Sequence, residues 1–440
     1  MRTRLSEDQR IEVLVDFVVM YIKAALLLFV SVMLFPCVGH SQAIHKWIHF
    51  SSEMSNSFYN KASGDGFEPG TKVNCVDRRA RNSETSGVCF SDKPFYFSVA
   101  LPEGNYKVSI TFGDELAATS TVVKAELRRL MLESVDTGKN KFVTKSFTVN
   151  VRTPQIRTGG EVKLKDREKT TEWWAWDEKL TLEFNGSRPT INAIEIQQVD
   201  VPTVFLLGDS TVSDQPSEPY ASWGQMITRF FGPNVAVANH AESGESLKSS
   251  FGAKRLDKVL SLMKSGDYLL IQYGHNDMKE KGENIGAFTS YKASLKQFVD
   301  AAKKKGASVI LINPMHRRTF DANGKITNSH GDYPEAVRQT AKEENVPLID
   351  LTAMSKDLYE TLGKDGSGSL FKDGDGTHHN NYGSYLLAKC IVQSIRDQKL
   401  LLARYLLKGS PKFDPRKPDD LKTFAIPASP AVTNLKPLGS

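Results

Sequence analysis

The chain has 440 residues, of which 40% are hydrophobic and 25% charged, and its formal net charge at pH 7 is +6. This composition is typical of a globular protein and excludes wholesale disorder, while the length predicts two domains. The basic residues are scattered and form no stripe interleaved with aromatic residues, which argues against nucleic acid as a partner.

The N-terminus is typical of a secretory signal. Lys23 precedes a largely apolar run over residues 24–35, and small or polar residues follow as far as residue 43. About twelve apolar residues suit the core of a signal peptide and are too few for a membrane span. Because acidic residues precede Met20 where a signal carries basic ones, we expect residues 1–43 to be a signal peptide with its true start at Met20. An uncleaved anchor is the alternative.

Beyond the predicted signal the cysteines are Cys75, Cys89 and Cys390. Cys75 and Cys89 can close a small loop in an oxidising compartment, although the sequence leaves open whether they pair. Cys390 lies in the apolar register of a predicted helix, which indicates a buried thiol. No Cys-x-x-Cys pair and no histidine cluster with ligand spacing is present, so the sequence predicts neither a metal nor a cofactor.

Residues 44–200 carry strand signals and few helical ones. An apolar run at 95–99, a turn at 102–105 and an alternating run at 106–112 predict a β-hairpin. Further strand candidates are residues 145–151, 179–184 and 191–197. Short strands separated by Gly, Pro and Asn predict a β-sandwich.

After residue 201 short apolar runs alternate with longer amphipathic segments. The strand candidates are residues 204–207, 235–239, 268–273, 308–313 and 347–350. Residues 291–305 and 382–396 place apolar side chains on one helical face. This alternation predicts an α/β domain over residues 201–410, with a mostly parallel sheet between helices and a site beyond the carboxyl ends of its strands. Residues 411–440, rich in Pro, Lys and Asp, are predicted to form a tail that wraps the surface.

Four short blocks follow the predicted strands or lie in loops that reach their ends. They are Gly208-Asp209-Ser210, Ser243-Gly244-Glu245-Ser246, Gly274-His275-Asn276-Asp277 and Asp375-Gly376-Thr377-His378. Ser210 follows a strand and a glycine, which exposes a hydroxyl nucleophile that needs a base. Asp375 and His378, three residues apart on a tight turn, can supply an orienting carboxylate and that base. The alternatives are a calcium-binding turn at residues 373–376 and His379 as the base.

Acyl transfer also needs hydrogen-bond donors for the oxygen that becomes negative in the tetrahedral intermediate. Gly244 can present a backbone N–H at close range, and Asn276 can present a side-chain amide just after a strand. The backbone N–H of Ser210 is the third candidate donor. Together the four blocks predict ester hydrolysis through an acyl-enzyme.

In order and kind, the blocks resemble those of the SGNH (GDSL-like) hydrolase superfamily over about residues 203–410. Within it the chain resembles the rhamnogalacturonan acetylesterase family, carbohydrate esterase family twelve. Other segments that resemble this family are residues 208–212, 223–224, 317–320, 330–334, 424–427 and 436–439. One departure is Glu245, because many relatives have arginine there, and the lost positive charge bears on recognition of an acidic pectin backbone.

The resemblance implies a flavodoxin-like three-layer α/β domain and a set of site residues. These are Ser210 as the nucleophile, Asp375 and His378 as the rest of the triad, and Ser210, Gly244 and Asn276 as the oxyanion hole. His316, Arg317 and His330 lie after or near a strand end, so they can line a substrate cleft, with Arg317 suited to carboxylates, or belong to an ordinary solvated loop.

Residues 97–114 and 180–196 resemble the galactose-binding-like sandwich that precedes some bacterial members of this family. Such domains often bind sugars, so Trp173, Trp174 and Trp176 are candidates for a stacking platform, with burial in a core as the alternative.

The resemblance implies a periplasmic or secreted bacterial esterase that removes acetyl groups from a plant polysaccharide, rhamnogalacturonan first of all. Its partner is then an acetylated polysaccharide, without cofactor, nucleic acid or stable membrane insertion after signal cleavage. The alternatives are another acetylated glycan such as xylan, or a carbohydrate-binding protein without activity. The oligomeric state stays open.

Overall fold

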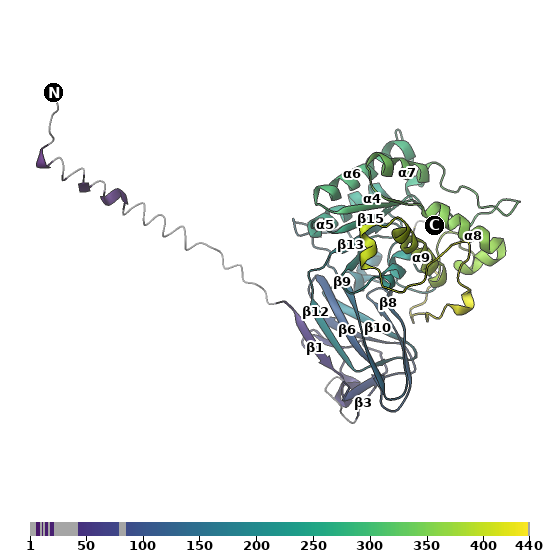
Figure 1. The fold of residues 1–440 in the computed structure, drawn as a ribbon, viewed down its shortest axis with the longest axis horizontal. Helices are drawn as coiled ribbons and strands as arrows, with labels where there is room; N and C mark the ends of the chain where they lie inside the picture. Colours follow the sequence, from purple (N-terminus) through teal and green to yellow (C-terminus); the bar gives the residue numbers. More distant parts are fainter. Residues whose placement is uncertain are drawn as a thin grey trace. The chain divides into compact units, whose positions relative to one another are not determined.

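The computed structural model describes residues 43–78 and 85–438 and, nearer the N-terminus, residues 6–8, 11, 14–15 and 18–21 (Figure 1). The chain separates into two compact units, Met1–Ala43 and Ile44–Ser440. The predicted signal core at 24–35 lies outside the described residues, so the signal peptide and its start at Met20 stay predictions. Within the described residues, no helix has the length and apolar character needed to cross a membrane. The domain boundaries predicted near residues 200 and 410 fall inside the second unit and also stay predictions.

The first part of the second unit is antiparallel, with strand orders β1-β12-β6-β9, β2-β5-β10-β7-β8 and β11-β4-β3. The strands are β1 (His45–His49), β2 (Asp65–Phe67), β3 (Asn74–Asp77), β4 (Gly87–Phe90), β5 (Phe95–Ala100), β6 (Gly104–Asp114), β7 (Thr119–Ala125), β8 (Arg129–Thr137), β9 (Lys141–Val151), β10 (Lys179–Arg188), β11 (Thr190–Ile191) and β12 (Ala193–Gln198). Phe97 of β5 and Val108 of β6 belong to one apolar core shared by the two larger sheets. The predicted β-sandwich is therefore confirmed.

The hairpin predicted from residues 95–112 is wrong. β5 pairs with β2 and β10, whereas β6 pairs with β9 and β12, so the turn between them crosses from one sheet to the other. An alternating apolar and polar pattern predicts a strand with one buried face, but it does not predict which strand pairs with it. Because both strands contribute apolar side chains to the core between the sheets, placing them on opposite sheets buries both sets.

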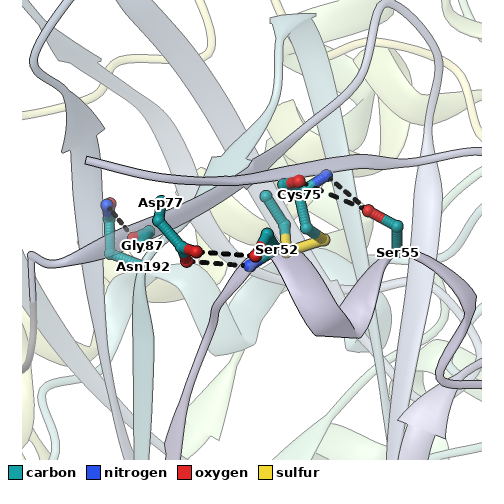
Figure 2. Close-up of a disulfide and its surroundings, with 7 residues drawn as sticks. Ser52, Ser55, Cys75, Asp77, Gly87 and Asn192 are labelled. Carbon is teal, nitrogen blue, oxygen red and sulfur yellow. Dashed lines mark hydrogen bonds between the residues drawn. A yellow bond between two sulfur atoms is a disulfide. The ribbon is translucent and has the colours of Figure 1, made fainter.

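Cys75 and Cys89 form a disulfide, which answers the question that the sequence leaves open (Figure 2). The two residues lie opposite each other on the antiparallel strands β3 and β4. The N–H and hydroxyl of Ser52 both donate to the carboxylate of Asp77, at 2.9 and 2.6 Å, and hold the preceding segment against β3.

The second part of this unit holds a parallel sheet with the order β14-β13-β15-β16-β17. Its strands are β13 (Thr203–Gly208), β14 (Ala236–Asn239), β15 (Tyr268–Gln272), β16 (Ser308–Ile312) and β17 (Leu348–Ile349). The α-helices of the unit are α2 (Asp166–Lys169), α3 (Trp223–Ile227), α4 (Leu247–Gly252), α5 (Arg255–Leu262), α6 (Lys292–Lys304), α7 (Tyr333–Glu343), α8 (Leu351–Gly366) and α9 (Asn381–Asp397). This strand order, 2-1-3-4-5 along the chain, confirms the predicted flavodoxin-like α/β class.

Successive residues of β13 face opposite sides of the parallel sheet. Val204 and Leu206 pack into an apolar cluster with α3, α8 and α9. Phe205 and Leu207 pack into another with α5, α6 and α7. The sheet therefore lies between two helical layers, and Cys390 of α9 is a buried free thiol, as predicted.

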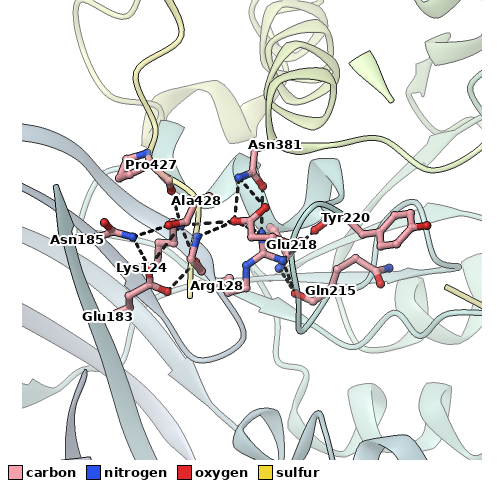
Figure 3. A network of polar contacts seen from close by, with 12 residues as sticks. Lys124, Arg128, Glu183, Asn185, Gln215, Glu218, Tyr220, Asn381, Pro427 and Ala428 are labelled. Atoms are coloured by element: carbon pink, nitrogen blue, oxygen red, sulfur yellow. Dashed lines mark hydrogen bonds and ion pairs between the residues drawn. The ribbon is translucent and has the colours of Figure 1, made fainter. Parts of the chain in front are cut away.

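A buried polar seam joins the antiparallel part, the parallel part and the tail (Figure 3). The Lys124 ammonium of β7 donates to the Pro427 carbonyl at 2.8 Å and lies 2.7 Å from the Ser429 hydroxyl. That hydroxyl donates to Glu183 of β10, and the Ser429 N–H donates to Glu218, both at 2.8 Å. The tail therefore does more than wrap the surface, because Ser429 is buried between both parts.

Candidate active site

Ser210 lies in the turn after β13, at the carboxyl end of the parallel sheet. A Cβ at Gly208 would lie only 2.5 Å from the side chain of Val212, so glycine permits this close approach. The Asp209 carbonyl accepts the N–H of Val212 at 3.0 Å and closes the turn.

The three residues predicted as a triad lie within hydrogen-bonding distance of one another. Nε2 of His378 is 2.9 Å from Oγ of Ser210, and Nδ1 of His378 is 3.0 Å from Oδ2 of Asp375. All three side chains are buried. If Nδ1 carries the proton toward the carboxylate, Nε2 is free to accept the proton of the serine hydroxyl.

The Asp375 carboxylate is held as an anion. Burial by itself would raise its pKa, but the hydrogen bond and charge of His378 and the N–H groups of Thr377 and His378 hold it below the usual range. His379, the alternative base, lies 2.7 Å from the Tyr359 hydroxyl, and its burial lowers its pKa to about 3. His378, not His379, is thus the histidine within reach of Ser210.

The predicted oxyanion donors are Ser210 itself, Gly244 in the loop after β14 and Asn276 in the loop after β15. Gly244 has φ +78°, a conformation that favours glycine. Among the residues that the structure describes, the backbone N–H groups of Ser210 and Gly244 have no assigned acceptor. The Asn276 side-chain amide donates one of its two hydrogens to the Glu245 carbonyl at 3.0 Å, and its second hydrogen can donate to an oxyanion.

Residues 242–246, here called the oxyanion loop, contact the connection between β9 and β10. The Lys165 ammonium donates to the Ser243 carbonyl at 2.7 Å and pairs with the Glu245 carboxylate at 2.9 Å. Sequence reasoning missed this contact, because Lys165 and Ser243 are 78 positions apart and share no motif. The charged run at residues 165–169, unusual within a β-rich part, was the one available signal.

Three further ion pairs involve the β9–β10 connection, one within it, one to the oxyanion loop and one to α5. Nη2 of Arg167 lies 2.8 Å from Glu242 and 3.1 Å from Glu172, while Glu168 accepts two hydrogen bonds from Arg255, at 3.0 and 2.6 Å. Burial, and then the charge of Glu242, raise the pKa of Glu172, and burial also raises the pKa of Glu242. This carboxyl pair therefore retains a proton at pH values where an exposed pair has lost both.

His330, predicted as a candidate substrate-binding residue, is fully buried, and its contact with substrate stays a prediction. Its Nε2 lies 3.0 Å from Nδ1 of His275, behind the block that carries Asn276. His316 is also buried. Arg317 is half-buried and donates to the His275 carbonyl at 3.3 Å, and its contact with substrate stays a prediction.

The three tryptophans have different environments. Trp176 is buried in a small apolar cluster with Val162, and its indole N–H donates to Glu168 at 3.1 Å. Trp173 is 45% exposed and meets Trp174 edge to face. Trp173 is thus the most exposed of the three, although the Lys179 ammonium lies over its ring at 4.6 Å from the centroid, and sugar binding there stays a prediction.

A cavity of about 270 Å³ has residues that contact the predicted triad and the oxyanion loop in its lining, but no triad residue itself. It is lined by Arg167, Glu172, Gln215, Tyr220, Leu435 and Leu438, among others. The Tyr220 ring meets the His378 ring edge to face at 6.0 Å, and Leu438 lies against Gly244. Within the described part of the chain, no group of three or more His, Cys, Asp or Glu side chains could hold a metal ion.

Comparison with known proteins identifies the family to which the parallel part of the chain is similar. The model of the GDSL-like lipase/acylhydrolase family matches residues 206–385. Rhamnogalacturonan acetylesterase RhgT of Bacillus subtilis is 39% identical over 224 residues, which are 48% of this chain and 96% of that protein. The uncharacterized esterase YxiM of Bacillus subtilis is 28% identical over 349 residues, 77% of this chain and 85% of that protein.

The crystal structure of protein YXIM from Bacillus subtilis covers 81% of this chain and 99% of its own, with a TM-score of 0.45 and 24% identity. The match with RhgT extends over nearly all of that protein. The chain belongs to the GDSL-like lipase/acylhydrolase family and is a carboxylic ester hydrolase related to the rhamnogalacturonan acetylesterases.

Proposed function

We propose that this protein is a secreted serine esterase that removes acetyl groups from plant cell-wall polysaccharide, with rhamnogalacturonan as its substrate. The observation that carries the proposal is the 2.9 Å contact of His378 Nε2 with Ser210 Oγ. The backbone N–H groups of Ser210 and Gly244 also donate to no other backbone group among the described residues, so they are available to an oxyanion.

In this mechanism the Ser210 oxygen attacks the acetyl carbonyl carbon while His378 accepts the hydroxyl proton. The carbonyl oxygen becomes negative and accepts hydrogen bonds from the N–H groups of Ser210 and Gly244 and from Asn276. The tetrahedral intermediate then expels the sugar oxygen, which takes the proton from His378 and leaves an acetyl ester on Ser210. Water then attacks that ester while His378 accepts one of its protons. The second tetrahedral intermediate expels the Ser210 oxygen, which takes this proton back from His378, and acetic acid leaves and ionises to acetate. Asp375 orients the imidazole throughout.

The substrate assignment is supported by the relatives. Three proteins of which this chain matches 84% or more are named as rhamnogalacturonan acetylesterases, one of them as a probable one. Acetylated xylan is the second candidate, because the triad acts on the ester and not on the sugar. The Glu245 carboxylate, which replaces a positive charge in the oxyanion loop, is paired with Lys165 and so adds no unpaired negative charge.

Secretion is supported by the Cys75–Cys89 disulfide, because such bonds persist in oxidising compartments. The predicted signal at residues 1–43 agrees with that location. Stacking of a sugar ring on the exposed face of Trp173 is part of this proposal.

The test is acetate release from acetylated rhamnogalacturonan and from acetylated xylan, measured side by side with the wild type and Ser210→Ala. Release from the first substrate that vanishes in the variant supports both the triad and the substrate. Release from xylan alone would retain the triad and overturn the pectin assignment. No release from either, with binding retained, would favour a carbohydrate-binding protein.

A further inference from the structure

Lys165 contacts the carbonyl of the same peptide unit whose N–H is the oxyanion donor. Its ammonium donates to the Ser243 oxygen at 2.7 Å, and the next atom after that carbonyl carbon is the backbone nitrogen of Gly244. A trans peptide is planar, with its C=O and N–H pointing in opposite directions. A fixed Ser243 carbonyl therefore fixes the direction of the Gly244 N–H.

The contact also acts on the strength of that donor. A cation on a peptide oxygen draws electron density from the nitrogen, so the N–H on the far side becomes a stronger donor. Hydrogen bonds from a charged donor are shorter and stronger than neutral ones. The Lys165 side chain is 30% exposed, so solvent weakens this effect without removing it.

Lys165 is also connected to Asn276, another predicted oxyanion donor, through Glu245. The same ammonium pairs with the Glu245 carboxylate at 2.9 Å, and this carboxylate is 1% exposed. The backbone carbonyl of Glu245 accepts the Asn276 amide at 3.0 Å, so the residue that Lys165 holds also orients Asn276. Lys165 is thus connected to two of the three predicted oxyanion donors.

We propose that Lys165, which lies between two strands of the β-sandwich, is a positioning residue that orients and polarises the oxyanion hole of the esterase site. This inference rests on the proposed ester hydrolysis. It gives the antiparallel part of the chain an indirect share in the chemical step, because a donor acts most strongly when it is already aimed at the developing oxyanion.

The experiment measures kcat and KM on a small acetyl ester with wild type and Lys165→Met. We expect kcat to fall about tenfold with KM within about twofold of wild type, since loss of a whole oxyanion donor costs about 100-fold or more and Lys165 acts through one. Lys165→Arg, which keeps the charge and the donor, should recover most of kcat. Lys163→Met is the matched control, because Lys163 is an exposed lysine two residues earlier in the same segment.

The outcomes separate this inference from the proposed function. No turnover by the wild type, or turnover that Ser210→Ala leaves intact, would overturn the proposed function. Serine-dependent turnover with kcat unchanged in Lys165→Met, or with a change confined to KM, would overturn the role of Lys165 alone. If Lys165→Met does not fold, Lys165→Met/Glu245→Gln removes the lysine together with the charge it neutralises, and the same fall in kcat is expected.

Discussion

The acid–base half of the site and the oxyanion half draw on different parts of the chain. Ser210, Asp375 and His378 meet through contacts within the parallel part, and the partner of each is another member of the triad. The oxyanion loop instead has its charged side chains paired with residues of the β9–β10 connection. The difference teaches that the predicted triad is held by contacts among its own side chains, whereas the charges of the oxyanion loop are neutralised by residues of the antiparallel part.

The largest expected effect comes from breaking a contact within the predicted triad. Asp375→Asn should lower kcat by about 10⁴-fold, because an amide cannot hold the imidazole in the tautomer that accepts the serine proton. The measurement is steady-state kinetics on a small acetyl ester. Asp373→Asn, an exposed aspartate in the same turn, is the control and should retain wild-type kcat. A loss below about tenfold in Asp375→Asn would remove this carboxylate from the triad.

The next prediction concerns the buried ion pair between Arg255 of α5 and Glu168 of the β9–β10 connection. Arg255→Met should lower the free energy of unfolding by about 3–5 kcal/mol, because it leaves the buried Glu168 carboxylate without its bidentate partner. Urea unfolding followed by circular dichroism measures this change. Arg255→Met/Glu168→Met should regain much of the loss, because both charges are then removed.

Arg338→Met is the matched control for Arg255→Met. Arg338 pairs with Asp350, but about a third of each side chain is exposed, so its loss should cost less than about 1 kcal/mol. Equal effects of the two arginine variants would show that the buried pair does not hold the β9–β10 connection in place.

Asn276→Ala tests the oxyanion half without touching the β-sandwich. It should lower kcat by about 100-fold and leave KM nearly unchanged, because the lost amide acts on the transition state. Kinetics on the same ester check this, with Asn234→Ala at an exposed position as the control. An effect on KM alone would exclude Asn276 as an oxyanion donor.

The comparison also explains which features the sequence predicts. The contacts among Ser210, Asp375 and His378 and the parallel sheet are predictable, because these residues each belong to a short motif after a strand or before a helix. The strand that pairs with β5 is not predictable, because alternation of apolar and polar residues indicates which side chains are buried and not which strands pair. Lys165 and Ser429 are missed for a related reason, since their contacts join distant segments by charge and hydrogen bonding, which leave no periodic pattern.

The smallest expected effect concerns the proton held between Glu172 and Glu242, next to the oxyanion loop. The pKa of Glu172 is raised in the fold above its usual 4.5, so the native state keeps a proton that the unfolded chain releases. This contribution to stability is complete below pH 4.5 and is lost as the pH rises through the raised value. Glu172→Gln, which is neutral at every pH, should therefore match the wild type near about pH 5 and unfold at a higher temperature near about pH 9.

The difference at the higher pH should be on the order of 1–2 °C, as expected for a large chain and one buried group. Thermal unfolding at both pH values measures it. Glu161→Gln, at an exposed glutamate of the same connection, should show no such pH-dependent gain. If Glu172→Gln instead lost stability equally at both pH values, the carboxyl pair would be held by Arg167 as an anion. The oxyanion loop would then be held against the β9–β10 connection by the ion pair of Arg167 with Glu242, and not by a proton shared between Glu172 and Glu242.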